Sequence, residues 1–147
     1  MNIRYAQEDD FNFIVEGLEK TRIIEKRPEK DIKAGISDKR KIKKAIKTKN
    51  IRVLVEEEKL IGFIFFLTDY DVMLIHQKFL WIDLIFINED FRGKGYGKLL
   101  YEDSIKIAKK LGIKKIVIDI FEANRNSLNF HKKIGFKPLY AIYYKEL

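Results

Sequence analysis

The sequence predicts an α/β domain built on a mixed β-sheet, and three observations lead to this fold class. Patterns typical of strands and helices occur in the order β-α-α-β-β-β-α-β-α-β, with hairpins in the middle and helical crossovers later. The 147 residues have the length of one domain, so we expect a single domain over residues 1–147. The composition, with 46% hydrophobic residues and only 2 prolines, is typical of a folded core and not of disorder.

The first third of the chain predicts one strand and two helices. Residues 3–6 form a short strand. The helix that follows has an apolar face at helical spacing, made of Phe11, Ile14, Val15 and Leu18. A second helix is expected to begin with Ser37 as its N-cap and to bury Ile42 and Ile46.

The rest of the chain alternates between strand and helix patterns. The expected elements are a hairpin with strands at 50–55 and 60–67 around a tip at 56–59, a strand at 79–87, a helix at 99–111, a strand at 116–121, a helix at 124–133 and a final strand at 139–144. Gly112 and Gly135 are expected to end the two helices, because glycine readily adopts the left-handed backbone found there.

The residue inventory excludes several kinds of chemistry. Cysteine is absent, which excludes disulfides, thiolate metal sites and a cysteine nucleophile. The only histidines are His76 and His131, so we expect no metal site. No serine lies in a G-x-S-x-G turn, which disfavours a serine triad. There is neither a transmembrane run nor a signal-peptide pattern, so we expect a cytoplasmic protein without a membrane partner.

The positive charge is concentrated in residues 20–50, which hold 13 lysines and arginines against 4 acidic residues. A nucleic-acid-binding module is one interpretation of such a segment. A solvated helical surface is favoured over it, because no aromatic side chain lies among the lysines between Ser37 and Asn50 to stack on bases. In a third interpretation, the basic face attracts an anionic cofactor.

A glycine-rich loop at residues 91–98 is the sharpest local signal. Glycines at alternate positions let successive backbone N–H groups face one point, and the helix that follows adds its positive end. The loop is neither a Walker P-loop nor a G-x-G-x-x-G motif, because Lys98 stands where both require glycine. A glycine-rich turn with solvated lysines is the alternative to a ligand site. The expected phosphate or diphosphate site comprises Arg92, Gly93, Lys94, Gly95, Tyr96, Gly97 and Lys98.

Asp83 is the only charged residue in the apolar strand at 79–87. An unpaired carboxylate in such a strand would be costly, so it needs a partner, water or a functional cleft. Asp83 is therefore a candidate site residue, with a partnered structural aspartate as the alternative.

Asn124, Ser127 and His131 recur at i, i+3 and i+7 and share one face of the predicted helix. His131 is therefore expected to point toward the interior or a cleft. A packed, hydrogen-bonded core histidine is the alternative to a functional one.

Together the two motifs resemble those of the GNAT superfamily of N-acetyltransferases. Arg92, Gly95 and Gly97 match the R/Q-x-x-G-x-G/A loop of that family. The later helix pattern, N-x-x-A/S-x-x-x-Y-x-x-x-G-F, is matched by Asn124, Ser127, Gly135 and Phe136, with His131 at the usual tyrosine position. The resemblance implies a GNAT-type fold, a central mixed sheet flanked by about four helices.

Residues 81–93 further resemble the diamine and thialysine acetyltransferase branch. Asp83 falls at the position of that branch's glutamate, a proposed base, and residues 67–71 are also similar to the branch. The acidic stretches at 56–58 and 69–71 are interpreted either as attracting a cationic amine or as solvated loops, with solvated loops favoured.

The resemblance implies acetyl-coenzyme A as the acetyl donor and a primary amine as the acceptor. By analogy, the diphosphate lies on residues 93–98 and the pantetheine arm runs along Ile85, Phe86 and Ile87, with Asn124 and Ser127 as further contacts. Without cysteine, we expect direct attack of the amine on the thioester, an oxyanion donor near Ile87, His131 as the acid, and Asp83 as a group that binds the amine or relays its proton.

The acceptor is left open by the sequence: a polyamine-like or amino-acid-like small molecule and a protein amine all fit. A nucleic-acid-binding module that uses residues 20–50, or a non-catalytic acetyl-coenzyme A sensor, are the alternative functions. Oligomeric state is not specified, and a homodimer is the common default.

Overall fold

The computed structural model describes residues 1–70 and 77–147, without the side chains of residues 69 and 70. The acidic stretch at 69–71 and His76 therefore lie outside the described side chains. The fold is a mixed sheet in the order β1-β2-β3-β4-β5, antiparallel except for the parallel pair β4–β5, which confirms the predicted α/β class. The strands are β1 (Asn2–Tyr5), β2 (Ile51–Glu56), β3 (Lys59–Tyr70), β4 (Phe79–Ile87) and β5 (Ile116–Ile118).

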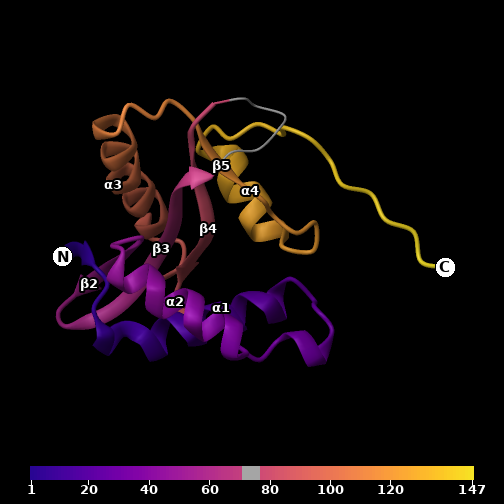
Figure 1. Ribbon diagram of the computed structural model, residues 1–147, viewed down its shortest axis with the longest axis horizontal. Coiled ribbons are helices and arrows are strands. Elements are labelled where there is room, and N and C mark those ends of the chain that lie inside the picture. The colour runs from indigo at the N-terminus through magenta and orange to yellow at the C-terminus, as the bar shows by residue number, and fades with distance from the viewer. Residues whose placement is uncertain (71–76) are drawn as a thin grey trace.

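In the described residues, four α-helices cover the sheet on its two faces (Figure 1). Helices α1 and α2 lie together on one face, and α3 and α4 lie on the other. Their bounds are α1 (Phe11–Ile24), α2 (Ile36–Lys47), α3 (Tyr96–Lys110) and α4 (Arg125–Lys133). Short 3-10 turns occur at Glu8–Asp10, Glu29–Asp31 and Glu89–Phe91. No helix in the described ranges combines the length and apolarity needed to cross a membrane.

Strand β4 is buried on both faces, as its apolar sequence predicts. Leu80 and Ile82 pack into the core under α3, while Phe86 packs into the core under α1 and α2. Its bounds match the predicted strand at 79–87, because a long apolar run with helices on both sides has a clear beginning and end.

A β-bulge interrupts β4 at Asp83. Phe65 and Phe66 of β3 face Leu84 and Ile82, so Asp83 is an extra residue without a partner on β3. The parallel pairing with β5 ends at the same point, with Ile82 opposite Ile118. Bulges re-aim side chains and are frequent beside active sites. Beyond Ile82, the edge of β4 on the side of β5 is open along the rest of the strand within the described residues.

Two helix starts differ from the sequence-based expectation. Helix α2 is capped at Gly35 and not at Ser37, because the Asp38 carboxylate accepts a hydrogen bond of 2.9 Å from the Gly35 N–H. Ile42 and Ile46 both face inward as expected: Ile42 is buried, and the half-buried Ile46 packs against the same core, as does the buried Ala45. Helix α3 begins at residue 96, before the expected 99, because Gly95 in a left-handed conformation allows the turn to close there.

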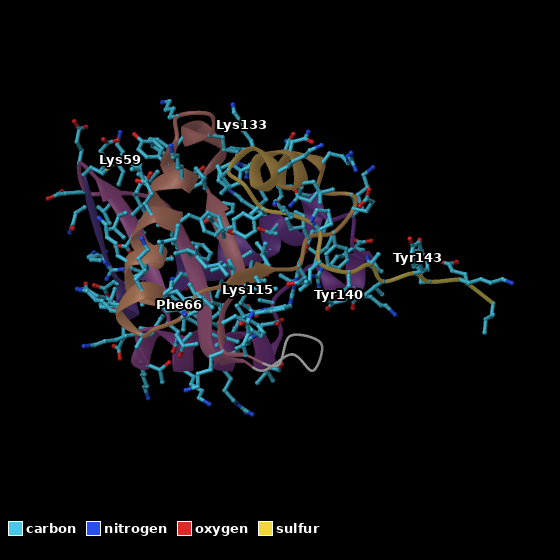
Figure 2. The ribbon with its side chains drawn as sticks, turned by 90° about the horizontal axis from the view of Figure 1, so that it is seen from above. Lys59, Phe66, Lys115, Lys133, Tyr140 and Tyr143 are labelled. Carbon is cyan, nitrogen blue, oxygen red and sulfur yellow. The ribbon has the colours of Figure 1, made fainter. Side chains whose placement is uncertain are left out.

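The strand predicted at 139–144 is wrong. The chain there is extended without strand pairing and runs away from the body, with Tyr140 and Tyr143 on it (Figures 1 and 2). Its large side chains are exposed, Tyr143 by 91%. Strand β5, predicted at 116–121, is paired only over residues 116–118. An apolar pattern indicates strand propensity, but a strand forms only where a neighbouring edge pairs with it.

Candidate active site

The loop at residues 91–98 has the backbone geometry of an anion site. Gly93 and Gly95 both have left-handed backbones, with φ of 76° and 84°, and open space lies where their Cβ atoms would be. Within the described residues, no backbone acceptor is found for the N–H groups of residues 93–98. These groups precede or begin α3, whose N-terminal dipole favours negative charge. The loop can therefore receive a phosphate group through its backbone.

Gly97 has a different role from the other two glycines. It lies in the first turn of α3, and a Cβ at this position would come within 2.9 Å of the Phe130 ring of α4. The third glycine of the loop therefore allows α4 to pack closely on α3.

The charged side chains of the loop are anchored to different degrees. Arg92 Nε donates a hydrogen bond of 2.9 Å to the Ile87 carbonyl and ties the loop to the end of β4. Tyr96 turns away from the loop and donates to the Glu56 carboxylate, so Glu56 is a structural partner. Lys94 and Lys98 are exposed and remain available to an anion.

The open edge of β4 leads from the loop to Asp83. The Asn88 N–H points toward β3, where it donates to the Ile61 carbonyl. Because the backbone N–H and C=O groups of successive strand residues point to opposite sides, those of Ile85 and Ile87 point away from β3. An amide-bearing chain can pair with this edge as an added strand. At α4, the Asn124 carbonyl oxygen caps the helix by accepting from the Ser127 N–H at 3.2 Å, which leaves the Asn124 amide N–H₂ available to a ligand.

Asp83 lies in the wall of a cavity of about 390 Å³ on the α1/α2 face of the sheet. Its carboxylate forms an ion pair of 2.8 Å with Lys41 of α2, which supplies the partner that a charge in an apolar strand requires. The Lys41 side chain is 52% exposed, so a cationic ligand can replace it at Asp83. The apolar part of the wall is formed by Ile14, Leu18, Ile42, Phe65, Leu67, Trp81 and Leu84.

A second carboxylate, Asp119, lines the same cavity. Asp119 directly follows the last residue of β5, and Asp83 directly follows the last β4 residue that pairs with β5. Partial burial and the nearby charge of Asp83 raise the pKa of Asp119 above its usual value, although Arg27 and Lys41 oppose this shift. Two carboxylates therefore flank the point where β4 and β5 separate, which is an arrangement suited to a cationic amine.

His131 lies on the opposite face of the sheet, 2% exposed and enclosed by the rings of Tyr101, Phe130 and Phe136. Its Nδ1 is 2.7 Å from the Ser127 carbonyl and its Nε2 is 2.6 Å from the Tyr101 hydroxyl. Because a carbonyl only accepts, Nδ1 carries the proton and Nε2 accepts from Tyr101. Burial lowers the pKa of His131, against the opposing effect of the Ser127 carbonyl.

The structure brings together the loop, the β4 edge and Asp83 along one strand, and it places His131 in a separate aromatic cluster. Sequence reasoning missed five charged residues of the cavity. Arg22, Arg27, Asp38 and Lys41 lie in the basic segment, and Asp119 was assigned to the middle of a strand. A signal was present, since Asp119 is a charge within an apolar run, as Asp83 is. In the described part of the chain, no group of three or more acidic or histidine side chains is placed to hold a metal ion.

Comparison with known proteins identifies relatives of this chain. A profile of the acetyltransferase (GNAT) family matches residues 18–136. An L-ornithine N5-acetyltransferase from Arabidopsis thaliana is 38% identical over 74 residues, which are 50% of this chain and 32% of that protein. A spermine/spermidine N(1)-acetyltransferase from Bacillus subtilis (strain 168) is 34% identical over 58 residues, 39% of this chain and 38% of that protein. The matched segments thus span about a third of these curated relatives.

The whole chain is similar in fold to a solved structure. A mutant protein from Bacillus halodurans superposes with a TM-score of 0.83 over 100% of this chain and 99% of that one, at 20% sequence identity. The similarity therefore extends to the first and last residues, which the family profile does not cover.

Proposed function

Because this chain belongs to the acetyltransferase (GNAT) family, we propose that it transfers the acetyl group of acetyl-coenzyme A directly to a primary amine. The observation that carries the proposal is the continuous path from the loop at 91–98 along the open edge of β4 to Asp83. The activities of these relatives, on ornithine and on spermine or spermidine, support a small-molecule acceptor.

The loop and the strand offer backbone groups that the coenzyme would use. The free N–H groups of residues 93–98 would hold the diphosphate, with Lys94 and Lys98 adding charge. Ile85 and Ile87 would pair with the amides of the pantetheine arm, and Asn124 would contact the same arm. When bound, the coenzyme would supply an activated thioester at the end of this path.

In the proposed reaction, the amine nitrogen attacks the thioester carbonyl carbon, the carbon–sulfur bond breaks and coenzyme A leaves as a thiolate. Asp83 would bind the acceptor as an ammonium in place of Lys41 and pass its proton to water before attack. A β4 backbone N–H at Ile85 or Ile87 would stabilise the oxyanion, a contribution of about 10²–10³ in rate for comparable donors.

His131 remains the proposed donor of a proton to the thiolate. The neutral imidazole has its single proton on Nδ1, so the role requires it first to take up a second proton, the one that the acylated nitrogen loses, and to exchange its hydrogen bond with Ser127 or Tyr101. The resulting imidazolium would then protonate the thiolate. This requirement makes the role of His131 directly testable.

Replacing Gly95 with alanine is expected to weaken acetyl-coenzyme A binding at least about tenfold, because the added Cβ enters the space of the phosphate and strains a left-handed residue. Isothermal calorimetry with acetyl-coenzyme A measures the effect. Gly112→Ala is the matched control: its φ of 71° gives the same strain at the opposite end of α3. It should lower the melting temperature similarly and leave the affinity unchanged.

The same titrations separate the alternative functions. Salt-dependent binding of DNA or RNA without binding of acetyl-coenzyme A would favour the nucleic-acid module and contradict our proposal. Binding of acetyl-coenzyme A without thiol release in the presence of any amine would favour a non-catalytic sensor.

A further inference from the structure

The cavity beside Asp83 is lined by equal numbers of positive and negative side chains. A site for a purely cationic acceptor would be expected to be mainly acidic. All three positive charges come from the basic segment at residues 20–50, which the proposed function otherwise leaves without a role. The six are Arg22, Arg27, Lys41, Asp38, Asp83 and Asp119.

The three positive and three negative side chains could form three ion pairs, and two of these pairs are present. Arg22 and Asp38 make a bidentate pair with distances of 2.8 and 3.1 Å, and this pair also fixes the start of α2. Lys41 and Asp83 form the exposed pair described above. Arg27 and Asp119 attract each other but do not form an ion pair.

Arg27 is held in place and yet keeps donors free. Its Nε donates to Glu25 at 2.9 Å, and its guanidinium carbon lies 4.6 Å from the centre of the Phe121 ring, two residues beyond Asp119. Among the described residues, its two terminal nitrogens have no hydrogen-bond partner. A guanidinium fixed by stacking with its terminal N–H groups free is suited to binding a carboxylate.

We propose that Arg27 and Asp119 bind the head group of an amino acid, so that the acceptor is an amine that carries its own α-carboxylate. Arg27 receives the carboxylate, Asp119 receives the α-ammonium, and the distal amine lies at Asp83. This inference rests on the proposed function and narrows its acceptor.

The apolar part of the cavity wall agrees with this assignment. Trp81 and Leu84 flank Asp83 on β4 and provide a surface for the methylene groups that join the head group to the distal amine. A polyamine would instead place a cation beside Arg27, which is unfavourable.

Acceptors that differ only in the α-carboxylate test the inference. We would measure kcat/KM by thiol release for L-ornithine against putrescine and for L-lysine against cadaverine. The amino acid of each pair is expected to be the better acceptor by about tenfold or more. Equal or better activity with the diamines, or activity only on lysine within a peptide, would overturn the inference.

Arg27→Gln is expected to lower kcat/KM for ornithine about tenfold, mainly through KM, and to change that for putrescine by less than about twofold. Arg40→Gln is the matched control, because Arg40 is an exposed arginine of the same basic segment outside the cavity. An equal loss for both acceptors in Arg27→Gln would contradict a head-group role.

The comparison of the wild-type acceptors does not depend on the folding of any variant. If Arg27→Gln is unstable, Arg27→Lys is measured in its place. Lysine keeps the positive charge, so kcat/KM for ornithine should fall by less than the roughly tenfold loss expected when the cation is removed. The two proposals fail differently: without thiol release from any amine the proposed function fails, whereas amine acetylation without a carboxylate preference overturns only this inference.

Discussion

Asp83→Asn is expected to lower kcat/KM for amine acetylation by about 10²-fold or more, with acetyl-coenzyme A affinity unchanged. Asparagine has the same shape but neither attracts the ammonium nor accepts its proton. The fold should tolerate the change, because the ion pair with Lys41 is partly exposed and such pairs contribute only about 0–1 kcal/mol. Steady-state kinetics with the preferred amine, together with calorimetry for acetyl-coenzyme A, measures both quantities.

The control for this variant is Asp9→Asn, an exposed aspartate in the 3-10 turn before α1. It removes the same charge from the chain and should leave kcat/KM unchanged. If Asp83→Asn keeps wild-type turnover, Asp83 neither binds the amine nor relays its proton, and the acceptor site must be sought elsewhere.

The sequence predicted elements best where local signals determine the structure. The bounds of β4 follow from an apolar run with both faces buried, and the hairpin between β2 and β3 follows from its polar tip. The failures depend on contacts between distant residues. The strand expected at 139–144 has suitable residues but no paired edge, and the cap of α2 at Gly35 depends on the Asp38 carboxylate.

The candidate site shows the same division. Asp83 could be identified because a lone charge in an apolar strand needs an explanation, and the glycine loop because left-handed glycines have few local roles. Arg27 and Asp119 are 92 positions apart in the sequence, and only the fold brings them to one cavity. Tyr101 could not be predicted as the partner of His131, because the contact depends on how α3 packs against α4 and not on the local sequence of either helix.

His131→Phe is expected to lower the free energy of unfolding by about 1–3 kcal/mol, because the buried Tyr101 hydroxyl loses its partner and the half-buried Ser127 carbonyl loses its bond to the imidazole. The Tyr101 hydroxyl and the Ser127 carbonyl both bond to the imidazole, and a phenyl ring replaces neither bond. Urea denaturation at pH 7.5 measures this loss. His131→Gln is the paired variant, because its amide retains one donor and one acceptor, so it should lose less stability.

The two variants also separate support of the fold from proton donation. If His131 protonates the thiolate, kcat per folded molecule should fall about 10²-fold in both, whatever their stability. Wild-type kcat in a destabilised variant would remove His131 from the acid role and leave it as the link between α3 and α4.

The pH dependence of stability provides an independent measure of the buried imidazole. The pKa of His131 is lowered in the folded state, so the unfolded chain binds its proton first as the pH falls below about 6.5. Wild-type stability is therefore complete above this pH and declines toward the lower, folded-state pKa. His131→Gln has no such proton, so the difference between the two proteins should shrink from pH 7.5 to pH 5.5. A constant difference would mean that the imidazole titrates normally and is open to solvent, which is the condition that proton donation to a thiolate requires.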